Sequence, residues 1–406
     1  MPTPLRLSYI AIVSESGSDG SQEWRHFGAL LARFGHGDPG RPREYYRAEL
    51  GSLTVRFERH TEFYRYTFSC SGPAAEAFSD VALARVPPDW LAGLTGSTLV
   101  AIHAALMPAT EDAEPDAIAA RYFDGNTPVG ADIAEGAGMA LTDFRVRDDG
   151  FMRVVLLNRD MTPRQSGRMM QRVVEIDTYR MLALMALPVA RELTPFLARA
   201  EREVTEVTTL LAGATRADEP LLLERLTRLE AAIGSQEIGS DYRFRAAFAY
   251  YELVQRRIRE LREVQRRGVQ TFLEFIERRL SPAMATCRAV SSRQEALSSR
   301  VARVNQLLAT RVDISRETQN QQLLESMNRR SAAQLRLQQT VEGLSIAAIT
   351  YYVVSLIEHA ARGLAESGVR LRPEVVAALC IPLVAVLVAL SLRHVRRRMI
   401  GPAGGE

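Results

Sequence analysis

The sequence predicts three successive parts: a mixed amino-terminal cytoplasmic domain of α+β or α/β class, a long α-helical stalk, and a carboxy-terminal transmembrane hairpin of two helices. Residues 1–160 predict the first part because strand-like runs, helical patterns and turn residues alternate there. Residues 165–341 predict the stalk because helical periodicity dominates them. Residues 342–398 predict the hairpin because they hold long uncharged apolar runs, followed by a basic cytoplasmic tail.

The composition narrows the class of protein. With 406 residues, 47% hydrophobic and 24% charged, the chain can bury cores, which excludes wholesale disorder. The 51 basic residues are all arginine, and against 48 acidic residues they leave a net charge of +3. This near balance gives no reason to predict a nucleic-acid partner. Cys70, Cys287 and Cys380 lie too far apart in sequence to predict a disulfide framework or a thiolate zinc site.

The first domain begins with a predicted strand at Leu5–Val13 and a predicted helix over residues 23–34. The alternating run at residues 55–70 predicts a long strand or a hairpin. Another hairpin is predicted over residues 142–158, because Asp149-Gly150 supplies residues that adopt the left-handed conformation of a tight turn. Together these elements predict a mixed domain, whose sheet order the sequence leaves open.

Three side chains in the run at residues 55–70 are candidate metal ligands. If the strand is continuous, Glu58, His60 and Glu62 lie two residues apart and point to one face. Two carboxylates and an imidazole can bind a divalent metal or move a proton. The alternative, which the sequence favours, is a half-exposed strand whose charged groups lie in water. No cofactor is predicted, and a divalent metal is the only candidate ion.

The stalk is predicted as several helices. A kinked helix is expected over residues 165–211, a short one over 221–232, and a long one over 241–280 with Asp241 as its N-cap. Pro282 marks a break, after which residues 283–342 contain neither proline nor glycine. The last helix carries apolar residues at coiled-coil spacing, namely Leu297, Val301, Val304 and Leu308. A self-associating stalk and an intramolecular bundle explain this spacing equally well.

Two predicted membrane spans follow the stalk. Residues 375–392 form an 18-residue run without a charge, and residues 343–357 form a shorter run that extends to a span over 341–361. Arginines precede the first span, at Arg329, Arg330 and Arg336, and others follow the second span. Because basic residues favour the cytoplasmic side, both ends of the hairpin are predicted to be cytoplasmic. After the second span the arginines are Arg393, Arg396, Arg397 and Arg398. Residues 1–13 show no signal-peptide pattern, so the bulk of the chain is expected in the cytoplasm.

Three small polar residues lie within the first predicted span. Ser345, Thr350 and Ser355 are candidates for pore lining or for helix packing. Steps of five residues on a helix of about 3.6 residues per turn do not place all three on one stripe. At most two of them are therefore expected to face a common pore.

Several stretches of the chain together resemble a known bacterial family. They are ERHTEFYRYTF at residues 58–68, TDFRVRDDGFMR at 142–153, QRVVEIDTYRMLALMALPVAR at 171–191 and LRLQQTVEGLSIAAITYYVV at 335–354. They resemble the uncharacterised membrane-anchored proteins of domain-of-unknown-function family 3422, over nearly the whole chain. The resemblance implies a cytoplasmic domain anchored in the bacterial inner membrane, with no assigned activity. Members usually begin with an Asn-Glu-x-His-Ala-Arg-Pro-like segment, which Met1 to Arg6 lack, so a longer native amino terminus is an open alternative.

Three functional hypotheses follow. The favoured one is a multi-pass inner-membrane protein, homo-oligomeric, whose cytoplasmic domain acts as a scaffold or sensor for protein partners not yet known. The alternative is an oligomeric ion channel or transporter similar in plan to CorA-type channels. That family's Gly-Met-Asn signature is absent, because the first span closes with Ser355, Leu356 and Ile357. The least favoured hypothesis is a hydrolase or metal enzyme centred on Glu58, His60 and Glu62.

Overall fold

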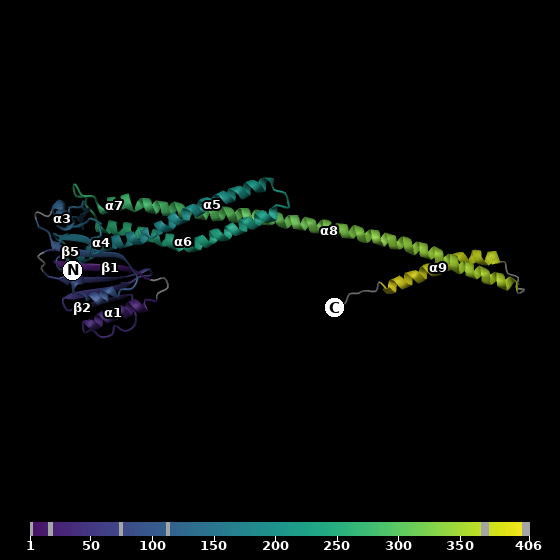
Figure 1. Cartoon of the computed structure of the whole chain (residues 1–406), viewed down its shortest axis with the longest axis horizontal. Helices are drawn as coiled ribbons and strands as arrows, with labels where there is room; N and C mark the ends of the chain where they lie inside the picture. Colours follow the sequence, from purple (N-terminus) through teal and green to yellow (C-terminus); the bar gives the residue numbers. More distant parts are fainter. Residues whose placement is uncertain (1–2, 15–18, 73–75, 111–113, 367–372, 400–406) are drawn as a thin grey trace. The chain divides into compact units, whose positions relative to one another are not determined.

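The computed structural model describes residues 3–14, 19–72, 76–110, 114–366 and 373–399 (Figure 1). The chain forms two compact units, Met1–Leu308 and Ala309–Glu406. The first unit holds a mixed sheet with helices, as the sequence predicts. Long helices make up the rest of the described chain.

The described residues contain one eight-stranded sheet in the order β2-β3-β4-β1-β5-β8-β7-β6. The strands are β1 (Leu5–Val13), β2 (Tyr45–Leu50), β3 (Leu53–Arg59), β4 (Phe63–Ser71), β5 (Ser97–Pro108), β6 (Val129–Ile133), β7 (Gly138–Thr142) and β8 (Met152–Asn158). Neighbouring strands are antiparallel, except for the parallel pair β5 and β8. The sheet is therefore mixed, and strands far apart in sequence, such as β1 and β5, lie side by side.

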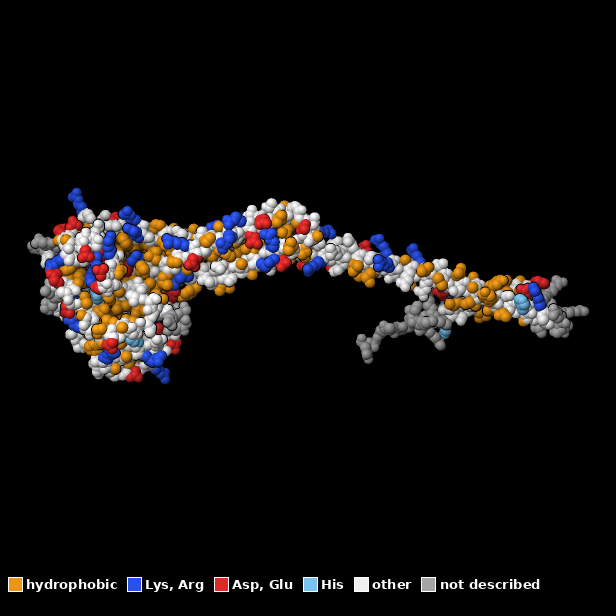
Figure 2. Space-filling model, viewed as in Figure 1, with side chains coloured by type: hydrophobic (Ala, Val, Ile, Leu, Met, Phe, Trp, Pro, Cys, Tyr) orange, Lys and Arg blue, Asp and Glu red, His pale blue; other side chains and the backbone are white. Residues whose placement is uncertain are grey.

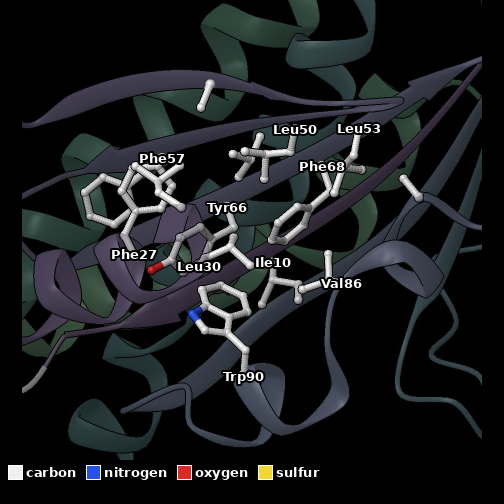
Figure 3. Close-up of a cluster of buried hydrophobic side chains, with 14 of the residues drawn as sticks. Ile10, Phe27, Leu30, Leu50, Leu53, Phe57, Tyr66, Phe68, Val86 and Trp90 are labelled. Carbon is white, nitrogen blue, oxygen red and sulfur yellow. The ribbon is translucent and has the colours of Figure 1, made fainter. Parts of the chain in front are cut away.

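One face of the sheet is covered by α1 (Ser21–Arg33), the 3₁₀ helix η1 (Ala82–Arg85) and α2 (Pro88–Ala92). Figure 3 shows the aromatic and aliphatic side chains that fill this layer, among them Phe27, Phe57 and Trp90. The rings of Phe27 and Phe57 stack with their centroids 5.2 Å apart. Trp90 donates its indole N–H to His26 O at 2.8 Å, so the ring is buried without leaving a donor unpaired.

The opposite face is covered by α4 (Pro163–Leu184), which packs on β5 and on α6. Thr162 and Gln165 form a capping box at its start, where Pro163 has no N–H to satisfy. Helices α5 (Ala186–Gly213) and α6 (Glu219–Leu261) continue this layer. The helix α3 (Pro115–Tyr122) covers β7 and β8 with a smaller apolar cluster. The sheet thus lies between helices on both faces.

Helix α7 (Phe272–Arg279) and the start of α8 (Ser281–Glu366) complete the first unit. The start of α8 is joined to α5 by Arg293, which donates to both carboxylate oxygens of Glu201 at 2.6 Å. It is joined to α6 by the contact between Gln294 and Ser240. The seam residues Leu297, Val301 and Leu308 are buried in the chain's own fold. Val304 is partly buried, so this stretch packs within the chain's own fold.

Two helix predictions are wrong. Residues 221–232 and 241–280 are not separate helices, because α6 runs without a break through Gly234 and Gly239. A glycine costs about 1 kcal/mol in a helix, which the packing of α6 on α4 and α5 outweighs. Asp241 therefore lies inside the helix and accepts a hydrogen bond from Arg245 instead of capping an end. The chain leaves the helix at Arg262, whose φ of 51° is left-handed.

One hairpin prediction is confirmed and the other is wrong in its first strand. Residues 55–70 form the hairpin of β3 and β4, the second of the two alternatives. In the second, β8 is the predicted second strand, but its partner is β7, from Gly138 opposite Asn158 to Thr142 opposite Val154, and not the residues that follow Thr142. Strands β7 and β8 are joined by residues 143–151 and not by a two-residue turn. Gly150, with φ of 81°, makes its tight turn inside this longer loop.

The second unit contains the remainder of α8 and the helix α9 (Pro373–Met399), which includes Pro382. Residues from both helices line one hollow of about 420 Å³, among them Thr350, Ser355 and Ile381. The two helices are therefore neighbours within this unit.

Candidate functional site

The alternation of β4 places a charged side chain in the interior. Tyr64 and Tyr66 point to the aromatic core, so Arg65 between them points to the opposite face, towards α4. Its guanidinium donates to Glu58 on β3 through Nε at 2.8 Å and Nη2 at 2.9 Å. It also donates through Nη1 to Glu175 of α4 at 3.1 Å. Arg65 thus ties the sheet to the helical layer.

Further ion pairs extend this contact into α6. Arg257 donates through Nε to Glu175 at 2.6 Å and through Nη1 to Glu260 at 2.9 Å. Arg172 of α4 in turn donates to Glu260 at 3.0 Å. At the other end, Arg56 Nε lies 3.0 Å from the Glu58 carboxylate. The result is a chain of alternating charges, hereafter the ion-pair chain: Arg56–Glu58–Arg65–Glu175–Arg257–Glu260–Arg172.

The electrostatics of the ion-pair chain keep its central groups charged. Burial alone would lower the pKa of Arg65, but Tyr9, Glu58 and Glu175 outweigh it and hold this pKa above its usual value. Burial alone would raise the pKa of Glu58, but the hydrogen bonds from Arg65 hold it below its usual value. Each carboxylate in the chain is held by two arginines. The arrangement therefore supports a structural role more than proton transfer.

The predicted trio of metal ligands does not share a strand face. Glu58 lies within β3 and belongs to the ion-pair chain, whereas His60 and Glu62 belong to the turn between β3 and β4. The shared face is absent because the run is a hairpin and the two-residue period stops at Arg59. No group of three or more His, Cys, Asp or Glu side chains in the described chain is placed to hold a metal ion.

The turn residues have other partners. Glu62 accepts two hydrogen bonds from Arg243 of α6, at 2.7 and 3.0 Å, which fastens the hairpin to the helical layer. The His60 ring stacks on Phe63 with centroids 4.4 Å apart. Burial, with a smaller contribution from Arg65, lowers the pKa of His60, so this imidazole is neutral at physiological pH. Both side chains serve to position the hairpin.

Next to the Arg56 end of the ion-pair chain, the sheet face is open. A hollow of about 670 Å³, hereafter the sheet hollow, lies over β2, β3 and β4. Arginines and hydroxyl groups line most of it, including Arg47, Arg56, Thr54, Thr67 and Ser69. Polar groups of several strands converge here on open space.

The comparisons with known proteins agree with the resemblance seen in the sequence. A family model described as "Protein of unknown function (DUF3422)" matches residues 1–399. The chain belongs to the DUF3422 family. Neither the curated proteins nor the solved structures contain a match to it. Two stretches that carry the resemblance supply four members of the ion-pair chain: residues 58–68 supply Glu58 and Arg65, and residues 171–191 supply Arg172 and Glu175.

Sequence reasoning missed most of the ion-pair chain in this DUF3422 protein. A signal was present, because Glu175 lies between the apolar residues Val174 and Ile176 in a helical stretch. A charge in such a position is almost always paired. The pairing partner could not be found, because Arg65 lies 110 residues away in sequence.

The DUF3422 protein also has helices long and apolar enough to cross a membrane. By length and composition two helical stretches qualify, Pro163–Gly213 and Phe272–Gly363, and α9 adds a shorter apolar stretch at Ala377–Leu392. In the first stretch 33% of the most apolar window is buried inside the protein, against 11% in the second. Figure 2 shows orange hydrophobic side chains gathered on the surface of the second unit.

The three polar residues of the predicted first span lie on α8. Ser345 donates its hydroxyl to Val341 O at 2.8 Å, and Thr350 donates to Ile346 O at 2.7 Å, each within the helix itself. Thr350 and Ser355 line the hollow shared with α9. The arginines Arg393, Arg396, Arg397 and Arg398 belong to α9, but their side chains lie outside the described part of the chain.

Proposed function

We propose that this DUF3422 protein is a membrane-anchored interaction protein: α8 and α9 form a transmembrane hairpin, and the mixed domain acts as a cytoplasmic scaffold or sensor. The observation that carries the proposal is the exposed apolar surface of the second unit. Leu344 and Leu379 are each 75% exposed, on α8 and α9 respectively. Such a surface is unfavourable in water and favourable in lipid.

The exposed apolar residues fall within both proposed spans. Over residues 341–361 they are Val341, Leu344, Ile349, Tyr351, Tyr352 and Leu356. Over residues 375–392 they are Val375, Leu379, Ile381, Leu383, Val386, Leu387 and Leu390. The density of exposed apolar groups supports a lipid environment for these two segments over a solvated helix pair.

The other apolar stretch, α4 with α5, has a different explanation. Its apolar side chains, such as Val173, Ile176 and Leu182, are buried in the first unit against the sheet and α6. A core helix of a soluble domain has the same length and composition as a membrane span. We therefore assign the two spans to the second unit alone.

The proposed orientation places both termini in the cytoplasm and the protein in a bacterial inner membrane. It rests on the arginines that precede residue 341 and those that follow residue 392. The mixed domain then faces the cytoplasm, where its open surfaces are available to partners. We assign it no reaction, because the carboxylates of the ion-pair chain are already held by arginines.

The test is an extraction and a pair of reporter fusions. Membranes from cells that express the full chain are washed with high salt and alkaline carbonate, and the protein is expected to stay in the pellet until detergent is added. A fluorescent reporter active in the cytoplasm and a phosphatase active only outside it are each fused to the carboxy terminus. Fluorescence without phosphatase activity is expected. Release by carbonate would overturn the anchor, and phosphatase activity would overturn the orientation.

The alternative, a CorA-like oligomeric channel, is favoured by one observation: Thr350, Ser355 and Glu358 bring polar groups into the hollow between α8 and α9. A pore would require several copies of the hairpin around one axis. Light scattering of the detergent-extracted protein at two concentrations distinguishes the hypotheses. A fixed ring-sized oligomer would favour the channel and justify ion-flux assays, whereas a monomer or dimer would exclude a self-assembled pore.

A further inference from the structure

The sheet hollow has features of a binding site that do not depend on the proposed membrane anchor. Its volume of about 670 Å³ is in the range that accommodates a small molecule. Its lining is mostly polar, with arginines and hydroxyl groups contributed by three different strands. Most of these side chains belong to the strand face that α1 does not cover.

The register of the strands brings two like charges together. Arg47 of β2 lies directly opposite Arg56 of β3, and Arg56 lies directly opposite Thr67 of β4. Like charges directly opposite on neighbouring strands destabilise a sheet. Arg47 is 3.5 Å from Glu49, at the exposed edge, and Arg56 shares the Glu58 carboxylate with Arg65. An anion placed between the two guanidiniums would relieve the repulsion.

The floor of the hollow contains polar groups without hydrogen bonds. Thr67 is 4% exposed, and its Oγ1 has no hydrogen-bond partner among the described residues. Arg56 Nε likewise lacks a hydrogen bond there, because its 3.0 Å approach to Glu58 does not have hydrogen-bond geometry. A buried polar group left unpaired costs about 1–3 kcal/mol. Two such groups side by side at one hollow indicate that a ligand satisfies them.

The charge of the surroundings selects the sign of that ligand. The ion-pair chain has four arginines and three glutamates, which leaves one positive charge in excess. Its Arg56 end opens onto the sheet hollow. Among the lining residues Arg47 and Arg56 face a single acidic side chain, Glu49. The site therefore favours an anion.

We propose that the sheet hollow binds a small ligand that carries a phosphate group. A carboxylate is planar and pairs best with one guanidinium, whereas a tetrahedral oxyanion accepts hydrogen bonds from several directions. The hollow supplies donors from three strands: Arg47 from β2, Arg56 and Thr54 from β3, and Thr67 and Ser69 from β4. Hydroxyl groups of the lining that do not contact the phosphate can donate to a polar moiety attached to it. A free phosphorylated metabolite and the headgroup of a phospholipid share this chemistry.

The test uses the full chain in detergent and calorimetric titration with inorganic phosphate, glycerol 3-phosphate, short-chain phosphatidic acid and citrate. Phosphate compounds are expected to bind and citrate is not. Binding of glycerol 3-phosphate would identify a free ligand as the source, and binding of phosphatidic acid alone would identify a lipid headgroup. No binding of any phosphate compound, or equal binding of citrate, would overturn the proposal.

Two variants and a control separate binding from folding. Arg56→Gln and Thr67→Val are each expected to weaken phosphate binding about tenfold or more, since each removes a hydrogen bond to the ligand. Thr67→Val keeps the side-chain shape and removes an unpaired hydroxyl, so its thermal stability without ligand should equal or exceed that of the wild type. Arg245→Gln, at a side chain 79% exposed on α6, should change neither quantity. Unchanged affinity in Thr67→Val would overturn the proposal.

Discussion

The two units of this protein differ in which side chains they bury and which they expose. In the first unit a large core of apolar side chains is covered by neighbouring elements, and several charged groups, such as Arg65 and Glu175, are buried. In the second unit many large apolar side chains are exposed, whereas Ser345 and Thr350 donate their hydroxyl groups within their own helix. This difference is the one that the proposed membrane anchor would produce.

The buried charges of the first unit are possible only because they alternate. Removing an arginine or a glutamate from water costs several kcal/mol, and the attraction of the partner charge offsets this cost only when the geometry is good. Arg65 meets that condition, with Glu58 on one side and Glu175 on the other. Exposed pairs of the second unit, such as Arg329 with Glu325, lie at the surface and contribute little. Substitutions in the two units should therefore have very different consequences.

The largest effect is expected from Arg65→Met. This change preserves side-chain bulk but leaves the Glu58 and Glu175 carboxylates buried without their shared partner, which should reduce the free energy of unfolding by about 3–5 kcal/mol. Denaturant unfolding followed by tryptophan fluorescence measures it, because Trp24 and Trp90, the chain's two tryptophans, both report on the first unit. The control Arg245→Met removes an exposed i,i+4 pair and should cost less than about 0.5 kcal/mol. Equal costs would show that the ion-pair chain is not structural.

The next effect compares two exposed apolar residues. Leu383 lies mid-way along the second proposed span and is 62% exposed, and Ile238 of α6 is 85% exposed. Leu383→Arg should disfavour membrane insertion by roughly 3 kcal/mol, because a charge is placed near the bilayer centre. Ile238→Arg should have no effect on insertion, since this residue faces water in the proposal. The measurement is the carbonate-resistant fraction of each variant, and equal fractions would contradict the assignment of lipid to the second unit alone.

Lowering the pH is expected to destabilise the first unit by a comparable amount through His103. The imidazole is 4% exposed, stacks on Phe151 with centroids 4.0 Å apart and shares a 2.8 Å hydrogen bond with Ser8. Burial, assisted by Arg153, lowers the pKa of His103 to about 4. The unfolded chain therefore binds more protons between the ordinary pKa of about 6.5 and pH 4. The contribution of His103 to the free energy of unfolding is fully present above pH 6.5. It is lost as the pH falls through this range, by about 3 kcal/mol in total.

The variant His103→Gln tests this assignment. It retains a hydrogen-bonding side chain for Ser8 but has no titrating group, so the part of the acid destabilisation that belongs to His103 should disappear. Unfolding midpoints are compared between pH 4 and 7. A variant that loses stability with falling pH as steeply as the wild type would show that other groups dominate the acid response.

Local patterns in the sequence predicted much of the secondary structure and little of the pairing. The strand at Leu5–Val13 was predicted to the residue, because its apolar run and its flanking turn residues act locally. The continuity of α6 through Gly234 was missed, because it depends on packing against α4 and α5. Glu58 was found as a candidate, but its true partner, Arg65, follows only from the register of the β3–β4 hairpin. The sheet hollow was missed because its residues meet only in the folded sheet.

The smallest effects are expected from replacing one serine in each unit by alanine, Ser240 in the first and Ser345 in the second. Ser240 in α6 is 3% exposed, with Oγ lying 2.8 Å from Gln236 O and 3.1 Å from Gln294 Oε1. Ser240→Ala leaves the buried Gln294 oxygen without this partner and should cost about 1–2 kcal/mol in fluorescence-detected unfolding.

Ser345→Ala is the matched change in the second unit. Because Ser345 donates only to Val341 O of its own helix, and that carbonyl remains free to accept its ordinary helical hydrogen bond, retention in the membrane should be unchanged. The informative measurement is the mass of the detergent-extracted protein. A lower mass for Ser345→Ala than for the wild type would mean that this hydroxyl packs between copies of the hairpin, which would favour the oligomeric pore over the simple anchor.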